Sequence, residues 1–184
     1  MRKSIPWLIS LVLVGWAISK MLPPKEAPGF DIEGFGQLPV LIGGRVMPMD
    51  TLARISLSVM NHHGTFTVDG RVEPASRWLL DVFMVPQRAD DAKVFEVTNP
   101  DILSLFGRQE VNGKPVSYSY KDCAPFLGEI GRQAGLAAQT EAQARNAFQR
   151  GILKLRDALR IYLLLKNSIQ AEDSPDFEIG RAHV

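Results

Sequence analysis

Apolar and polar residues alternate at helical spacing from about Thr140 to Ser168. Apolar side chains recur there every three or four positions, at Phe148, Ile152, Leu155, Leu159, Tyr162 and Ile169. This spacing predicts one long amphipathic helix with a packing seam. Its other faces carry basic residues, at Arg145, Arg150, Lys154, Arg156, Arg160 and Lys166, with Asp157 as the only nearby acid. These faces are either solvated or in contact with acidic head groups or an acidic partner.

A second helical pattern follows Asp50. Its apolar face consists of Leu52, Ile55, Val59 and Met60, with Ser56 among them. We expect the Asp50 carboxylate to cap this helix by accepting an amide hydrogen of the first turn. The helix should end between Asn61 and Gly64, because glycine there can take the left-handed backbone conformation.

Short elements fill the rest of the chain. Gly43-Gly44 and Asp69-Gly70 are typical of tight hairpin turns between extended pieces. Pro74 precedes a helical pattern over residues 75–84. Asn99-Pro100 and Gly107 bracket a compact helix with a capping asparagine, a first-position proline and a terminating glycine. Residues 116–120 are predicted to be extended, and the helical pattern returns from Ser119.

Together these elements predict an α+β fold: a predominantly helical exported domain with small β-hairpins, preceded by one transmembrane helix. The expected core contains one tryptophan and four phenylalanines, namely Trp78, Phe83, Phe106, Phe126 and Phe148.

The transmembrane prediction rests on residues 5–22. The centre of this segment, residues 8–18, carries no charge, and as a helix the segment would cover about 27 Å, close to a bilayer's hydrocarbon thickness. Arg2 and Lys3 place the N-terminus in the cytoplasm by the positive-inside rule. The alternative is a cleaved signal peptide, but Lys20-Met21-Leu22-Pro23 fits a small-residue cleavage site poorly. Both interpretations export the domain.

The expected organisation has five parts. Residues 1–4 are a cytoplasmic N-terminus, 5–22 a transmembrane anchor, 23–29 a Pro-rich linker and 30–177 an exported periplasmic domain. The last part, residues 178–184, resembles the translation of a DNA-sequencing adapter and is expected to be non-native. On that interpretation the natural protein continues past residue 177.

Charge and cysteine content exclude some classes of function and of structural bond. The 184 residues include 21 Lys and Arg against 20 Asp and Glu, a formal charge of +1 that gives no general attraction to nucleic acid. Cys123 is the only cysteine, which leaves no internal disulfide. We expect it to be a small buried thiol rather than a nucleophile, because no base lies near it in the sequence.

No catalytic, cofactor-binding or metal-binding residue is assigned from the sequence, and enzymatic activity stays open. His62 and His63 are adjacent, so on a helix they point about 100° apart and cannot grip one metal. The guanidinium of Arg45 could bind a carboxylate or a propionate, but such an arginine more commonly pairs with a nearby acid such as Asp50. Four further acids form no recognisable acid and base pair: Asp81, Asp90, Asp91 and Glu96.

One stretch carries a family resemblance. Residues 35–40 read Phe-Gly-Gln-Leu-Pro-Val, and residues 43–54 read Gly-Gly-Arg-Val-Met-Pro-Met-Asp-Thr-Leu-Ala-Arg. They resemble a signature in exported N-terminal regions of bacterial cytochrome c biogenesis proteins of the haem-delivering System II type. Further similar blocks are residues 78–86, 94–103 and 148–167. We expect the motif residues to be structural devices: Gly43, Gly44, Arg45, Pro48, Asp50 and Thr51.

The resemblance implies a membrane-anchored factor in c-type cytochrome biogenesis, in the bacterial inner membrane with its domain in the periplasm. The whole protein would handle haem for attachment to apocytochrome c, with haem bound in a part that follows this chain. This chain would supply the anchor in the lipid bilayer and a domain that positions apocytochrome c or a partner assembly subunit. The alternative is a generic single-pass envelope scaffold that binds another protein and is unrelated to haem.

Overall fold

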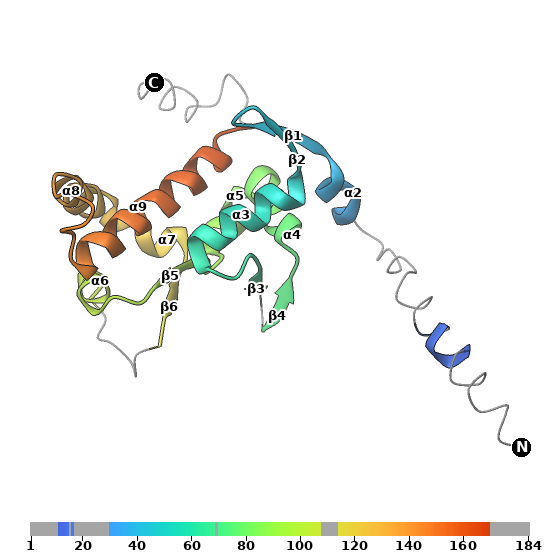
Figure 1. Cartoon of the computed structure of the whole chain (residues 1–184), viewed down its shortest axis with the longest axis horizontal. Coiled ribbons are helices and arrows are strands. Elements are labelled where there is room, and N and C mark those ends of the chain that lie inside the picture. Colours follow the sequence, from blue (N-terminus) through green and yellow to red (C-terminus); the bar gives the residue numbers. More distant parts are fainter. Residues whose placement is uncertain (1–10, 15, 17–29, 69, 108–113, 170–184) are drawn as a thin grey trace, which may run out of the picture. The chain divides into compact units, whose positions relative to one another are not determined.

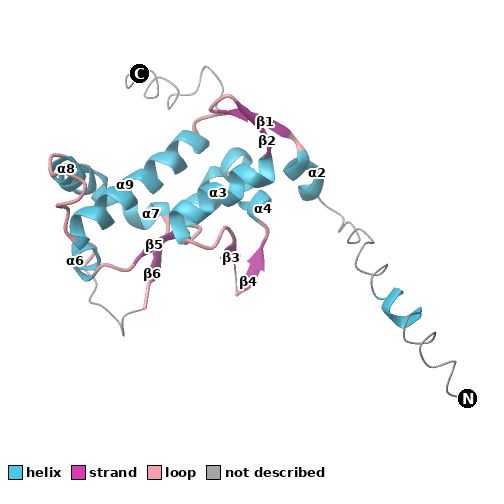
Figure 2. Cartoon of the chain, viewed as in Figure 1, coloured by secondary structure: helices cyan, strands magenta, loops and turns pink. Residues whose placement is uncertain are grey.

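The computed structural model describes residues 11–14, 16, 30–68, 70–107 and 114–169. The chain divides into two compact units, Met1–Asp31 and Ile32–Val184. In the first unit, residues 11–14 and 16 are helical. The second unit combines helices with three small two-stranded sheets (Figures 1 and 2).

The helices of the second unit are α2 (Ile32–Gln37), α3 (Met49–Asn61), α4 (Ala75–Met84), α5 (Pro86–Asp91), α6 (Pro100–Leu105), α7 (Tyr120–Cys123), α8 (Leu127–Ala138) and α9 (Ala147–Lys166). A short 3₁₀ turn, Ala124–Phe126, joins α7 to α8. The strands form antiparallel pairs: β1 (Pro39–Ile42) with β2 (Arg45–Pro48), β3 (Phe66–Val68) with β4 (Arg71–Glu73), and β5 (Phe95–Val97) with β6 (Val116–Tyr118).

The prediction of a transmembrane helix is wrong. Among the described ranges, no helix is both long enough and apolar enough to cross a bilayer. The longest, α9, has 20 residues and carries charged side chains along its length. Of the expected span at 5–22, residues 5–10, 15 and 17–22 lie outside the described residues, as do the predicted linker at 23–29 and the tail at 178–184.

Helix α9 lies at the centre of the second unit, in contact with α3, α4, α6, α8 and β5 (Figure 1). It begins at Ala147, later than the pattern predicts. The cause is a capping box, in which Asn146 accepts from the Gln149 amide and the Gln149 side chain accepts from the Asn146 amide. The predicted seam is buried at Ile152, Leu155, Leu159 and Tyr162, whereas Phe148 is half-buried and Ile169 is exposed beyond the helix end.

Aromatic residues on different elements meet around α9. The ring of fully buried Tyr162 lies 5.7 Å from Phe95, 5.1 Å from Tyr120 and 6.4 Å from Trp78, centroid to centroid. Of the five predicted core aromatics, Trp78 is fully buried. The others pack against the core while half-buried: Phe83, Phe106, Phe126 and Phe148.

Several predicted boundaries are confirmed. Helix α3 ends where His62 takes a left-handed conformation, with φ at 65°. Pro74 is the residue before α4, and Gly70 lies in the β3–β4 turn with φ at 77°. Cys123 is a buried free thiol, and burial together with the neighbouring Asp122 carboxylate raises its pKa to about 12. A thiol with this pKa is a poor nucleophile at neutral pH.

The predicted α6 unit is also confirmed. The Asn99 side chain accepts hydrogen bonds from the Asp101 amide at 2.9 Å and the Ile102 amide at 3.3 Å, and Pro100 occupies the first turn. Gly107 follows with φ at 70°. The helix places Ile102 and Leu103 in the core next to α9.

We expect Asn99→Ala to lower the free energy of unfolding by about 1 kcal/mol, because two first-turn amides lose their acceptor. Urea denaturation followed by circular dichroism measures the change. Asn99→Ser is the matched control, since serine keeps an acceptor and should restore most of the loss. Equal stability of the alanine and asparagine proteins would contradict the capping role.

Candidate functional site

The β1–β2 hairpin forms the most exposed apolar surface of the motif region. Its register pairs Leu41 with Val46 and Pro39 with Pro48. Directly paired residues lie on the same face of a sheet, and positions two apart along a strand share that face. Leu41 is 68% exposed and Val46 is 72% exposed. We call this surface, made of Pro39, Leu41, Val46 and Pro48, the hairpin face.

Two glycines, Gly43 and Gly44, form the tight turn at the tip of the hairpin. Gly43 has φ at 56° and Gly44 has φ at 78°, the two positive angles that a type I′ turn requires. A Cβ at either position would meet no atom within 4 Å, so backbone conformation rather than crowding demands these glycines. Proline lacks an amide hydrogen, so Pro39 and Pro48 restrict the addition of a further strand at the hairpin base.

The base of the hairpin is fixed to the helical core. The Met49 amide donates to the Leu38 carbonyl at 2.9 Å, which closes the ladder. In α2, Gly36 is buried, and a Cβ there would lie 3.3 Å from the Asp50 Cβ and 3.4 Å from the Ser76 Cβ. The Phe35 ring meets Phe83 edge-on at 6.3 Å. The motif therefore joins α2, α3 and α4 and leaves the hairpin face open.

Two expectations for motif side chains are wrong. Helix α3 begins at Met49, so Pro48 takes the cap position and Asp50 lies within the first turn, where its side chain makes no capping bond. Instead, Asp50 accepts from Arg54 Nε at 2.6 Å, a pair four residues apart on the helix. Arg45 is exposed and has no ion pair with any residue that the structure describes. Thr51 is half-buried in the first turn of α3.

His62 and His63 lie beside different side chains. Lys154 Nζ lies 2.6 Å from His62 Nε2 and 3.3 Å from Nδ1, while His63 Nε2 lies 4.0 Å from a Glu96 carboxylate oxygen. Within the described part of the chain, no three metal-ligating side chains of the His, Cys, Asp and Glu types come together.

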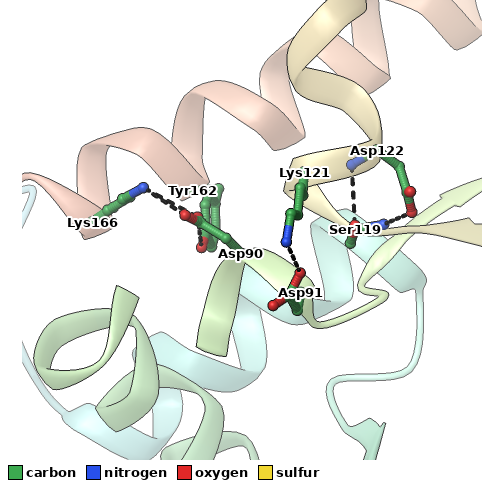
Figure 3. Close-up of polar contacts among 7 residues, drawn as sticks. All are labelled: Asp90, Asp91, Ser119, Lys121, Asp122, Tyr162 and Lys166. Atoms are coloured by element: carbon green, nitrogen blue, oxygen red, sulfur yellow. Dashed lines mark hydrogen bonds and ion pairs between the residues drawn. The ribbon is translucent and has the colours of Figure 1, made fainter. Parts of the chain in front are cut away.

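Three of the four acids left unassigned by sequence have a cationic neighbour. Asp81 lies 3.7 Å from both Arg77 and Arg88, measured between Nε and carboxylate oxygens. Asp91 pairs with Lys121 at 3.1 Å. Asp90 is the most connected: it accepts from the Tyr162 hydroxyl at 2.7 Å and from Lys166 Nζ at 2.9 and 3.1 Å (Figure 3).

The Asp90 cluster, defined as Asp90, Tyr162 and Lys166, is a structural device. Figure 3 shows the Asp90 carboxylate from α5 facing the two side chains of α9, while the neighbouring Asp91 turns to Lys121 of α7. Lys166 also lies 5.2 Å from the centre of the Tyr120 ring. These contacts join α5, α7 and α9.

Sequence reasoning missed both the hairpin face and the Asp90 cluster. Tyr162 and Lys166 are four residues apart on one helix and could be paired from spacing, but Asp90 is 72 residues from Tyr162, and no local pattern links them. The exposure of Leu41 and Val46 could not be inferred either, because a short continuous run of apolar residues usually predicts a buried strand.

Comparison with known proteins does not assign this chain to a family. No family model and no curated protein matches this chain.

We expect Asp90→Asn to lower the free energy of unfolding by about 1–3 kcal/mol, because the mostly buried Lys166 and the Tyr162 hydroxyl lose a charged acceptor. The matched control is Asp91→Asn, which breaks an exposed pair and should cost less than about 0.5 kcal/mol. Urea unfolding of both proteins measures the difference. Equal losses would show that the cluster contributes no more than a surface pair.

The dependence of stability on alkaline pH tests whether the buried Tyr162 hydroxyl stabilises the fold. Burial raises its pKa above the usual value, and the hydrogen bond to Asp90 raises it further. The unfolded chain therefore ionises first, and stability present below pH 10 is lost as pH rises, at about 1.4 kcal/mol per pH unit. In Tyr162→Phe this contribution is absent. We expect the stability gap between the two proteins to shrink between pH 10 and 11 in urea titrations; a constant gap would contradict it.

Proposed function

We propose that residues 32–166 form a protein-positioning domain in the assembly of c-type cytochromes. The observation that carries the proposal is the hairpin face, where two paired apolar side chains stand open to solvent within the stretch that carries the family resemblance. Contiguous exposed apolar surface marks interaction sites in folded proteins. The partner would be apocytochrome c or a partner assembly subunit, and the compartment would be the periplasm.

The construction of the hairpin supports this role. Helix α2 precedes β1 by one residue, and β2 leads directly into α3. The buried Gly36 and the Phe35–Phe83 contact hold these helices against α4. A rigid base lowers the entropy lost when a partner binds. Covering Leu41 and Val46 would contribute about 2–4 kcal/mol, enough to change binding by at least about tenfold.

Haem is not assigned to the described residues. A haem iron takes axial ligands such as histidine or methionine, and here both ring nitrogens of His62 lie within 3.3 Å of Lys154 Nζ. His63 is exposed, and its Nε2 lies 4.0 Å from a Glu96 carboxylate oxygen. In our proposal haem chemistry belongs to other parts of the assembly machinery, and this domain binds protein.

The test replaces the two open side chains in the full-length gene. In a strain that lacks the gene, we expect Leu41→Ser with Val46→Ser to lower the amount of covalently haem-bound cytochrome c, because partner binding weakens. Haem-dependent peroxidase staining of membrane and periplasmic fractions measures it, with the level of the protein itself measured in parallel by immunoblot.

Val72→Ser provides the matched control. Val72 is 71% exposed and also lies in a two-stranded hairpin, β3–β4, but outside the motif region. This variant should keep the wild-type cytochrome level. Wild-type cytochrome in the Leu41/Val46 variant, at equal protein level, would refute the proposal. If that variant still lost a co-purifying protein partner, the envelope-scaffold alternative would replace it.

A further inference from the structure

The solvent-facing side of helix α9 carries a row of exposed cations. Arg150, Lys154 and Arg160 are all exposed. At about 100° per residue they fall within an arc of about 120°, opposite the buried side chains of Leu155 and Leu159. With a rise of about 1.5 Å per residue they extend over about 15 Å of the helix. We call this surface, made of Arg150, Lys154 and Arg160, the cationic ridge.

Neighbouring acids do not neutralise the ridge. Asp157 lies on the same side of α9, but it pairs with Arg156 at 2.7 Å. None of the three ridge cations makes an ion pair with a residue that the structure describes, whereas Lys166 of the same helix pairs with Asp90 at 2.9 Å. The ridge therefore keeps a local positive charge, although the formal charge of the whole chain is only +1.

Uncharged acceptors hold two of the ridge cations in place. The Arg150 guanidinium donates to the backbone carbonyl of Arg145, and Lys154 Nζ lies 2.6 Å from His62 Nε2. A guanidinium has five N–H donors and an ammonium has three, so both groups keep donors for a ligand. Because these side chains already have partners that position them, binding an anion costs less of their conformational entropy.

The buried side of α9 argues against a lipid surface as the ligand of the ridge. An amphipathic helix that binds a membrane inserts its apolar face among the lipids. In α9 that face is part of the domain core, at Ile152, Leu155 and Leu159. Only electrostatic attraction to anionic head groups would remain. Nucleic acid is disfavoured because the near-zero charge of the chain gives no general attraction to it.

We propose that the cationic ridge binds an acidic segment of a partner protein. Carboxylates accept charge-assisted hydrogen bonds from guanidinium and ammonium groups, and an arginine can hold one carboxylate through two parallel bonds. An extended segment covers 15 Å with about five residues. The segment therefore carries three carboxylates, one for each ridge cation, within about that length. This inference concerns a different surface from the hairpin face and does not rest on the proposed function.

The test measures binding of a fluorescein-labelled hexaglutamate peptide to the full chain by fluorescence anisotropy. We expect saturable binding at about 20 mM salt that weakens at about 200 mM salt, because the Debye length shortens. Replacing all three ridge cations, Arg150→Gln with Lys154→Gln and Arg160→Gln, should lower the affinity about tenfold. No saturable binding, or an unchanged affinity in this variant, overturns the proposal.

A matched control removes the same charge elsewhere. Arg71→Gln with Lys93→Gln and Lys114→Gln replaces three exposed cations outside α9, and it should keep the affinity within about twofold. Circular dichroism checks that both triple variants fold, as exposed substitutions should. Equal losses of affinity in the two variants would show only a general attraction to positive charge and would overturn the proposal.

Two further probes separate the classes of partner. Vesicles of phosphatidylglycerol and phosphatidylcholine represent a lipid surface, and a single-stranded oligothymidylate represents nucleic acid. Both should bind more weakly than the peptide. Tighter, ridge-dependent binding of either one overturns the assignment to an acidic protein segment. The hairpin variant, Leu41→Ser with Val46→Ser, should bind the peptide like the wild type, so the outcome here is independent of the cytochrome experiment.

Discussion

Tyr162 is the side chain on which the arrangement of the second unit depends. Its ring contacts Trp78 of α4, Phe95 of β5 and Tyr120 of α7, and its hydroxyl donates to Asp90 of α5. A tyrosine suits this position because its apolar ring can be buried while its hydroxyl reaches a polar partner. Four elements are thereby held against the central helix α9, and the short strands and helices need little stability of their own.

The same packing leaves one surface of the motif region open. The hairpin face belongs to the region fixed by α2, α3 and α4. Its apolar side chains are exposed although the base beneath them is tightly packed. This exposure departs from what packing alone would favour, and such departures are typical of functional surfaces.

The sequence predicted helix caps and turns correctly where a single residue or pair of residues determines the backbone conformation. Asn99 caps α6 because its own side chain reaches the next amides, and Gly43-Gly44 forms a turn because both residues tolerate positive φ. Asp50 shows the limit of such reasoning. Its side chain could cap a helix, but the cap position of α3 lies two residues earlier, at Pro48, and Asp50 pairs with Arg54 instead.

The sequence by itself determined the helices with strong periodicity and the turns with glycine, because these depend on neighbours within a few residues. It also predicted the burial of Trp78 and Cys123, because both side chains are largely apolar. Only the tertiary structure decided that Asp90 meets Tyr162 and that Leu41 and Val46 stay exposed. Each of these depends on which elements pack together, and contacts between residues far apart in the chain leave no periodic trace in one sequence.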